Sequence, residues 1–389
     1  PKTDEKGNEI DFKTLKSLNI VMQLLGRVSI ISGTLLVSLV NLVMFSDSSE
    51  MSENEKIITY GKIYLYSLIV PAISIIGVLF SYINSKSRLN ELVKNGLAFE
   101  KAYNLVYPIT KITKPNPSII IGSILFVIFT ISIGFSKIPF SQEIVFTGSL
   151  AIIIYLLITL SSQLDPVAKR MLIGTAIIIF VFRAMPGVGP GASWFEIDIL
   201  KFDQEFLSFL GLIASILTIF GIFVLRPLME NSSMSRLIVI LSIAGSIFLL
   251  PSLGMFYGIH EITSKITNGI VDARFIAIFN TALESPLGQV SMIPILAWIA
   301  QSAPSHLKAT FFAVLASFTN LALSASNLGT KYLNQIFVVT REVKSKSGEV
   351  TTQADYSELG ILLITVLLLT LILPILATIF IRKLKLIAY

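Results

Sequence analysis

Ten apolar segments recur along the chain, and each is long enough to cross a membrane as one helix, which takes about 17–25 residues. Within them the apolar residues run continuously, a pattern that favours helices over the alternating strands of a membrane barrel. The sequence therefore predicts an all-α polytopic membrane protein. Its ten transmembrane helices are expected at residues 15–45, 58–83, 117–135, 140–163, 168–184, 203–226, 235–258, 269–300, 305–336 and 358–382.

The composition agrees with this class and excludes several kinds of chemistry. Hydrophobic residues make up 53% of the 389 residues and charged residues only 14%, against about 25% charged in soluble proteins. There is no cysteine, and the two histidines, His260 and His306, lie near predicted membrane edges. Without a Ser–His pair, a metal-ligand cluster or a nucleotide fingerprint, we expect no enzyme activity, no cofactor and no metal. The net charge of +6 indicates basic loops rather than a nucleic-acid partner.

Lysine and arginine are divided unevenly between the two sides of the membrane. The loops on the side of the N-terminus, among them 84–116, hold more than twice as many as the loops on the other side. Because cytoplasmic loops carry an excess of these residues, we expect both termini and loop 84–116 in the cytoplasm and residues 337–357 outside. The protein is expected to be a multi-pass protein of the cell's inner membrane.

The two predicted helices within residues 269–337 are not uniformly apolar. The first carries Asp272, Arg274, Asn280 and Glu284, and the second carries Asn320, Ser324 and Asn327. The second set advances by three or four residues, which places it on one helix face. Polar groups at membrane depth usually face a bundle interior or a watery cavity, so both sets are candidates to line a solute pathway. Hydrogen bonding between helices explains the Ser and Asn face equally well.

Glu284 is the central candidate, because it lies about ten residues from either end of its segment, where a charge is hardest to accommodate. Asn280 lies one turn before it, and Pro286 follows closely. Such a carboxyl group can hold a proton and release it when water or substrate arrives. The alternative is that Glu284 pairs with Arg274 or another buried cation and is structural.

Two further arginines and one tryptophan complete the candidates. Arg27 lies about three turns into the first helix, as a functional cation or as a side chain that reaches back to the interface. Arg183 precedes a Pro- and Gly-rich turn at 186–191, and irregular backbone at membrane level is tolerated only beside protein or a cavity. Trp194 follows the turn, either as an interfacial anchor or as part of a gate.

Residues 182–207 read FRAMPGVGPGASWFEIDILKFDQEFL. They resemble the segment before the eighth helix of the folate–biopterin transporter family, which belongs to the major facilitator superfamily. Residues 303–326 read APSHLKATFFAVLASFTNLALSAS and are similar to the segment that leads through its eleventh helix. Residues 17–33 are similar, more weakly, to its fifth helix, and the resemblance is best over residues 168–389.

The resemblance implies a helical bundle of the major facilitator type and a domain organisation. Residues 1–83 would be the remainder of an N-terminal helical half with two helices, the helices before them being missing. Residues 84–116 would form a basic cytoplasmic loop, 117–163 an additional transmembrane hairpin, and 164–389 the C-terminal six-helix half.

The resemblance further implies a secondary active transporter that moves a folate- or pterin-like solute by alternating access. Proton coupling, as in a symporter, is expected from the carboxyl groups at membrane depth. Asn280, Asn320 and Asn327 suit the edges of such a ring. Arg27, Arg183 or Arg274 would meet a carboxylate, and Glu284 or Asp272 would carry the coupling proton. The expected partners are the small-molecule solute, the lipid bilayer and a proton, and the protein is expected to be a monomer. A non-transporting scaffold or receptor, or a transporter of a different organic solute, remains as an alternative, because fold does not fix substrate.

Overall fold

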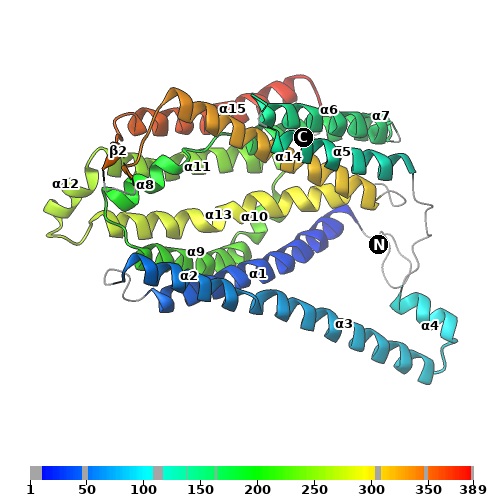
Figure 1. Ribbon diagram of the computed structural model, residues 1–389. Helices are drawn as coiled ribbons and strands as arrows, with labels where there is room; N and C mark the ends of the chain where they lie inside the picture. Colours follow the sequence, from blue (N-terminus) through cyan, green and yellow to red (C-terminus); the bar gives the residue numbers. More distant parts are fainter. Residues whose placement is uncertain are drawn as a thin grey trace. The chain divides into compact units, whose positions relative to one another are not determined.

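The computed structural model describes residues 11–45, 51–107, 117–136, 138–162, 164–302, 308–345 and 349–386 (Figure 1). These residues form 15 α-helices and one two-stranded sheet. The chain divides into two compact units. Unit 1 holds residues 1–42 and 136–389, and unit 2 holds residues 43–135.

Unit 1 contains eleven helices of the described chain, with most of α1 among them. Their bounds are α1 Phe12–Met44, α6 Ser141–Ser161, α7 Pro166–Arg183, α8 Pro190–Asp198, α9 Gln204–Val224, α10 Arg226–Asn231, α11 Met234–Phe256, α12 Ile259–Ile266, α13 Ala273–Ser302, α14 Lys308–Ile336 and α15 Leu359–Lys383. The hairpin strands are β1 Val343–Lys344 and β2 Val350–Thr352, paired antiparallel.

The predicted helical membrane class is confirmed, with differences in detail. Seven described helices are long and apolar enough to span a membrane, so the predicted count of ten is not confirmed; α5, α7 and α13 are the predicted spans outside the seven. Three short helices, α8, α10 and α12, were not expected from the sequence. They follow a helix end or a Gly-rich turn, where the apolar pattern that predicts longer helices is interrupted.

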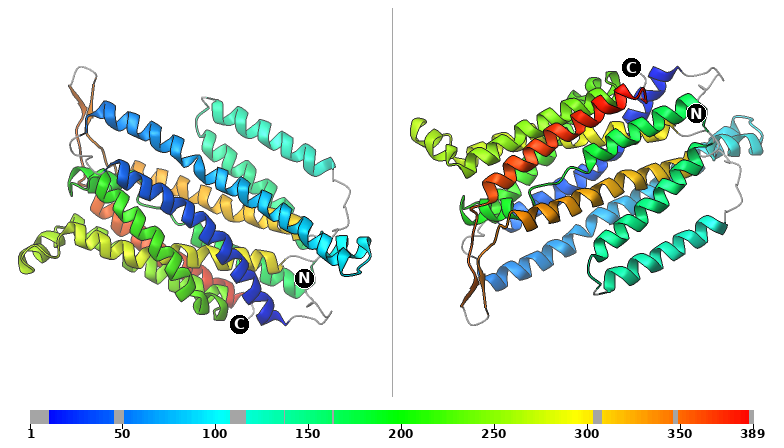
Figure 2. Two further views of the ribbon diagram at one scale, coloured as in Figure 1. Left: turned by 90° about the horizontal axis from the view of Figure 1, so that it is seen from below. Right: turned by 90° about the horizontal axis from the view of Figure 1, so that it is seen from above.

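The helices of unit 1 pack lengthwise, with α13 through the middle (Figures 1 and 2). It lies against α9 on one side and against α11 and α14 on others, while α15 packs on α11 and α7. One buried cluster joins α1, α9, α10, α11 and α13 through residues such as Ile20, Ile222 and Ile293. α9 and α13 come into close contact at Gly221, which has no side chain to collide with the Pro286 ring.

α6 is packed into unit 1 rather than standing apart from it. Leu160 belongs to a buried cluster with Leu172 of α7 and Leu315 of α14. Nζ of Lys331 donates to Oε1 of Glu143 at 2.7 Å, and the Tyr332 hydroxyl donates to the same oxygen at 2.7 Å. α6 is therefore tied to α14 by both apolar and ionic contacts.

A polar face of α14 holds the Pro- and Gly-rich segment between α7 and α8. The Ser326 hydroxyl donates to the Met185 carbonyl at 2.6 Å, and the Gly187 N–H donates to the Thr330 hydroxyl at 2.8 Å. One turn further, Nδ2 of Asn334 donates to the Val188 carbonyl at 3.0 Å. These contacts satisfy backbone groups that no helix pairs, which is what allows irregular backbone at membrane depth.

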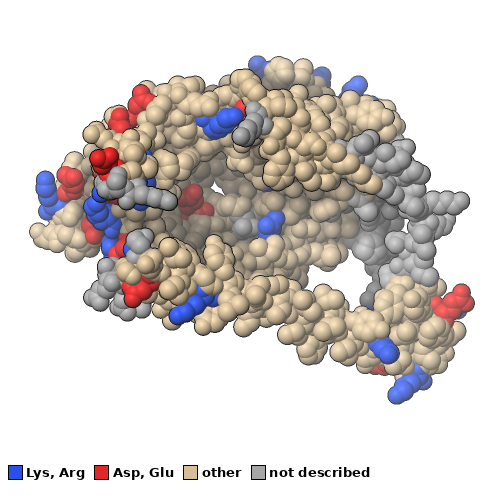
Figure 3. Space-filling view, viewed as in Figure 1, with Lys and Arg blue, Asp and Glu red and all other residues tan. Residues whose placement is uncertain are grey.

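The end of unit 1 that carries α8, α12 and the β-hairpin is called the α8 end. Here Arg341 donates from Nη2 and Nε to the two carboxylate oxygens of Asp198 at 2.7 and 2.8 Å. The Tyr356 hydroxyl donates to Asp198 Oδ2 at 2.7 Å. Figure 3 shows charged side chains gathered around this end, whereas the flanks of the helices are largely uncharged, as a lipid-facing surface requires.

Unit 2 contains α2 Glu53–Ser67, α3 Ile69–Lys94, α4 Phe99–Val106 and α5 Pro117–Phe135. α2 begins with a capping box, in which Ser52 and Glu55 each bond to the other's backbone N–H. The single helix predicted at 58–83 divides at Leu68, so that Pro71 falls in the first turn of α3, where its missing N–H costs little. Much of the predicted loop 84–116 is helical, in α3 and α4, and residues 108–116 lie outside the described ranges. The predicted hairpin 117–163 is divided, with α5 in unit 2 and α6 in unit 1.

Candidate functional site

Glu284 and Asn280 are bonded to one another on one face of α13. Nδ2 of Asn280 donates to Oε2 of Glu284 at 3.3 Å. Residues four apart lie one above the other on a helix, so the local sequence is sufficient to bring them together. Oδ1 of Asn280 and Oγ of Ser285 are both buried, and neither has a hydrogen-bond partner within the described structure. This part of α13 therefore combines a carboxylate with an amide oxygen and a hydroxyl that have no described partner.

Arg274 does not neutralise Glu284. Its Nη2 lies 2.9 Å from Oδ2 of Asp203, and its guanidinium stacks 4.9 Å from the ring centre of Phe206. In the described part of the chain no basic side chain lies within ion-pair distance of Glu284. The expected alternative in which Arg274 pairs with Glu284 is therefore not found.

A second carboxyl group, that of Glu196 on α8, lies near Glu284. Burial raises the pKa of Glu196, and the negative charge of Glu284 raises it further. The direction follows because both effects disfavour the ionised form. Glu196 lies close to Trp194 in sequence, yet the effect of Glu284 on it depends on the packing of α8 and α13 and has no signal in the sequence.

Arg183, the last residue of α7, is held by groups that leave its charge uncompensated. Its Nε donates to the Thr319 carbonyl of α14 at 3.1 Å, and its Nη1 contacts Sδ of Met292 on α13 at 2.8 Å. A carbonyl and a thioether are neutral, and the thioether is a weak acceptor. The remaining N–H groups of the guanidinium are thus available to a ligand.

Arg27 of α1 adds a second positive charge near Arg183. The charge of Arg27 acts on Arg183, which places the two guanidinium groups within electrostatic range of one another. Among the described residues no hydrogen bond or ion pair satisfies the Arg27 side chain, and both arginines are half-buried. Two cations brought together without a carboxylate form a site of positive potential, which suits an anion.

The polar face of α14 predicted from the sequence is distinct from the one that binds the segment after α7. Asn320, Ser324 and Asn327 are exposed, and no contact joins any of them to Glu284 in the described structure. Lys331, which continues this face, pairs with Glu143 of α6. The middle of this face is therefore exposed, whereas its end at Lys331 is covered by the ion pair with α6. The neighbouring face of Ser326, Thr330 and Asn334 was missed by the sequence analysis, although its four-residue spacing could have indicated it.

Two other predicted candidates have structural contacts at the α8 end. Oδ1 of Asp272 accepts the Phe275 N–H at 2.8 Å, which caps the first turn of α13. Trp194 is half-buried on α8, but the ring that stacks there is Phe195, whose centre lies 5.5 Å from that of Phe256 and 5.8 Å from that of Tyr356. The α8 end thus holds Asp272, Arg274 and Trp194, and it is separate from the pair formed by Arg27 and Arg183.

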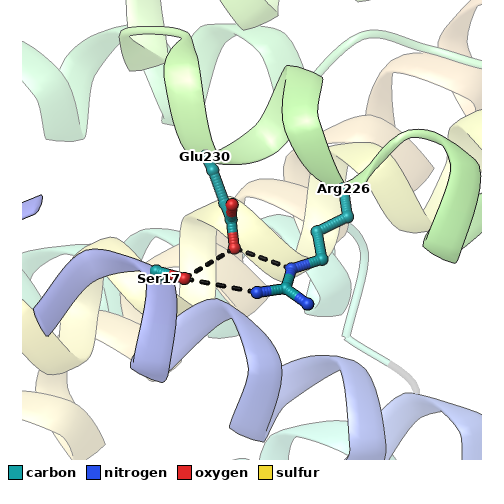
Figure 4. Close-up of polar contacts among 3 residues, drawn as sticks. All are labelled: Ser17, Arg226 and Glu230. Carbon is teal, nitrogen blue, oxygen red and sulfur yellow. Dashed lines mark hydrogen bonds and ion pairs between the residues drawn. The ribbon is translucent and has the colours of Figure 1, made fainter. Parts of the chain in front are cut away.

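At the opposite end of unit 1, called the α10 end, α1 is bound to α10 by a polar cluster (Figure 4). The Ser17 hydroxyl donates to Oε1 of Glu230 at 2.8 Å, and Nε of Arg226 donates to the same oxygen at 2.7 Å. Nζ of Lys16 also donates to the Ser232 carbonyl at 2.9 Å. Burial acts to raise the pKa of Glu230, but these hydrogen bonds and the nearby positive charges outweigh it and lower the pKa. Glu230 is therefore ionised at neutral pH, and its hydrogen bonds join α1 to α10.

Comparison with known proteins identifies one family. A family model described as the BT1 family matches residues 28–388, nearly the whole chain and well beyond the stretch 168–389 in which the sequence resemblance was best. No curated protein matches the chain.

Proposed function

Because the chain belongs to the BT1 family, the folate–biopterin transporters, we propose that it carries a folate- or pterin-like solute across the membrane by alternating access, coupled to protons. The protein is an integral, multi-pass membrane transporter and not an enzyme. The observation that carries the proposal is the pair of uncompensated arginines, Arg27 and Arg183, in the same unit as the carboxyl pair of Glu284 and Glu196.

The arginine pair would bind the carboxylate of the solute. Guanidinium groups present several N–H donors in a planar fork that matches a carboxylate. Arg183 has neutral partners, and Arg27 has none among the described residues. An anion would therefore gain attraction without having to displace a protein carboxylate. The exposed amides of Asn320 and Asn327, on α14 next to the Arg183 contact, would pair with the ring edges.

Glu284 would carry the coupling proton. It has an amide donor in Asn280 and no counter-charge in the described structure, and a second carboxyl group lies nearby in Glu196. Because the charge of Glu284 disfavours ionisation of Glu196, a proton released by one carboxyl group would be favoured on the other. In each cycle the carboxylate would take a proton from water on one side and return it to water on the other.

Alternating access would require the α10 end to open and close. The Ser17–Glu230–Arg226 cluster joins α1, which we assign to the N-terminal half, to α10, which we assign to the C-terminal half of residues 164–389. We assign the α10 end and both termini to the cytoplasm of a protein in the inner membrane that works as a monomer. Labelling tests this on the cysteine-free chain: a cysteine at Thr352 should react only from outside.

Uptake into proteoliposomes tests the proposed function directly. Purified full-length protein should accumulate folate when an inward proton gradient is imposed, and a protonophore should abolish accumulation. Pterin, which lacks the carboxylates, should depend less on Arg27 and Arg183 than folate does. Binding without gradient-driven uptake would instead identify a receptor or scaffold that retains the fold. Gradient-driven uptake of neither compound would identify a transporter of a different solute.

A further inference from the structure

An apolar groove runs between α7 and α15 on the outside of unit 1, where Figure 2 (right) shows the two helices side by side. It is an open groove with a volume of about 720 Å³, and its walls are formed by residues such as Phe180, Met185, Leu376 and Phe380. Its single charged lining residue is Lys383, at the α10 end. The groove is distinct from the arginine pair, because Arg183 turns its guanidinium the other way, towards Thr319 and Met292.

Basic residues from both helices gather where the groove ends at Lys383. On α15, Arg382 and Lys383 form the last turn, and Lys385 follows it. On α7, Gly174 lies against the backbone of Leu386, and Arg170 stands one turn before Gly174 on the same helix face. Arg170, Arg382, Lys383 and Lys385 are all exposed, and within the described ranges none has a hydrogen bond or ion pair from its side chain.

Among the residues that the structure describes, no acidic side chain pairs with these cations. From α15 to the end of the described chain there is no Asp or Glu. The nearest acidic residue on α7 is Asp165, whose Oδ1 is occupied by the N–H groups of Val167 and Ala168 at 3.0 and 2.9 Å. Blue side chains accordingly lie along the upper edge of Figure 3, over α15 and α7.

We propose that this groove is a binding site for one anionic phospholipid. An acyl chain would lie along Phe180 and Phe380, and the phosphate would meet Lys383 together with Arg382 and Arg170. Basic pockets between transmembrane helices bind anionic head groups, with about 1 kcal/mol for each Lys or Arg near the surface. The volume lies within the roughly 300–1,000 Å³ of small-ligand sites. A zwitterionic lipid would fill the groove as well but would gain nothing from the cations.

Native mass spectrometry and thermal unfolding of the full chain in detergent test the site. Added phosphatidylglycerol should be retained on the protein and should raise Tm more than phosphatidylcholine of the same chain length. The double variant Arg382→Gln/Lys383→Gln should bind phosphatidylglycerol roughly 30-fold more weakly, at about fivefold per charge. Lys265→Gln, an exposed lysine of α12 at the other end of unit 1, is the matched charge control and should bind normally.

A variant that fills the groove distinguishes the contribution of the acyl chain to binding from that of the head group. Ala377→Phe places a ring in the groove and should abolish the preference for phosphatidylglycerol while Tm in detergent alone is kept. Glycerol phosphate, the head group without chains, should not reproduce the stabilisation. Equal binding of the two lipids, equal stabilisation by glycerol phosphate, or unchanged binding by both variants would each overturn the proposal.

Discussion

Arg183 is bonded through Nε to the backbone carbonyl of Thr319, 3.1 Å away on α14, and no carboxylate of the described ranges pairs with it. A neutral carbonyl fixes the guanidinium in place without cancelling its charge. The residue at the end of α7 is therefore both rigid and attractive to an anion, and this combination leads to the first prediction.

Arg183→Gln should lower folate uptake by about tenfold to a hundredfold, the loss of a hydrogen bond to a charged group worth about 1.5–3 kcal/mol. Arg183→Lys should recover part of the rate, because it restores the charge but not the planar fork. Arg274→Gln, which removes a cation already paired with Asp203, is the control and should keep normal uptake. Equal losses in the Gln variants of Arg183 and Arg274 would contradict the assignment.

Glu284→Gln should remain inserted and folded while its uptake loses dependence on the proton gradient. The change strands no cation, since Arg274 is paired elsewhere. Uptake across a series of external pH values, with Tm measured in parallel, is the test. Asp272→Asn is the control: it weakens a helix cap at a cost of about 1 kcal/mol or less and should leave the pH profile unchanged. A Glu284→Gln protein with wild-type pH dependence would end the proton-carrier proposal.

Glu196 should make the protein less stable as pH rises. Because burial and the charge of Glu284 raise its pKa, the folded state binds this proton more tightly than the unfolded state does. Its contribution to stability is thus present at low pH and is lost as pH rises through the raised pKa. Tm of Glu196→Gln should fall less than wild-type Tm over this window. A steeper fall in the variant would show the opposite sign.

Cross-linking α1 to α10 should stop transport. In the cysteine-free chain, Ser17→Cys combined with Glu230→Cys replaces a contact of 2.8 Å with a pair that an oxidant or a short thiol reagent can join. Uptake should fall to background when the pair is joined and return when the cross-link is cleaved. Each single-cysteine variant, treated in the same way, is the control. Full activity with a complete cross-link would mean that this contact never opens.

Gly221→Ala should destabilise the protein by about 1–3 kcal/mol through overpacking. A methyl group at Gly221 would collide with the rigid ring of Pro286, which cannot turn away. Gly26→Ala on α1 is the matched control, because nothing lies within 4 Å of its added methyl group; a helical Gly→Ala change there should stabilise by about 0.5–1 kcal/mol. Chemical unfolding in detergent measures the free energy of unfolding of both variants. Similar free energies for the two would contradict the close α9–α13 contact.

Features that depend on neighbours a few residues away could be predicted from the amino-acid sequence. Apolar runs of membrane length specified the helical class and the positions of most helices within a few residues, as at α9, α11 and α15. The four-residue step from Asn280 to Glu284 specified their hydrogen bond. Both follow from helix geometry, which is the same whatever the helix packs against.

Contacts between groups far apart in the sequence could not be predicted in this way, because they depend on how the helices pack. Arg274 was a candidate partner for Glu284, but Asp203, on a different helix end, takes it. Arg27 reaches the vicinity of Arg183, and Glu196 that of Glu284, across gaps of more than 80 residues. α14 carries two polar faces that look alike in sequence, yet one binds the segment after α7 and the other stays exposed. Periodicity defines the faces of a helix, whereas the partner of each face depends on how all the helices pack together.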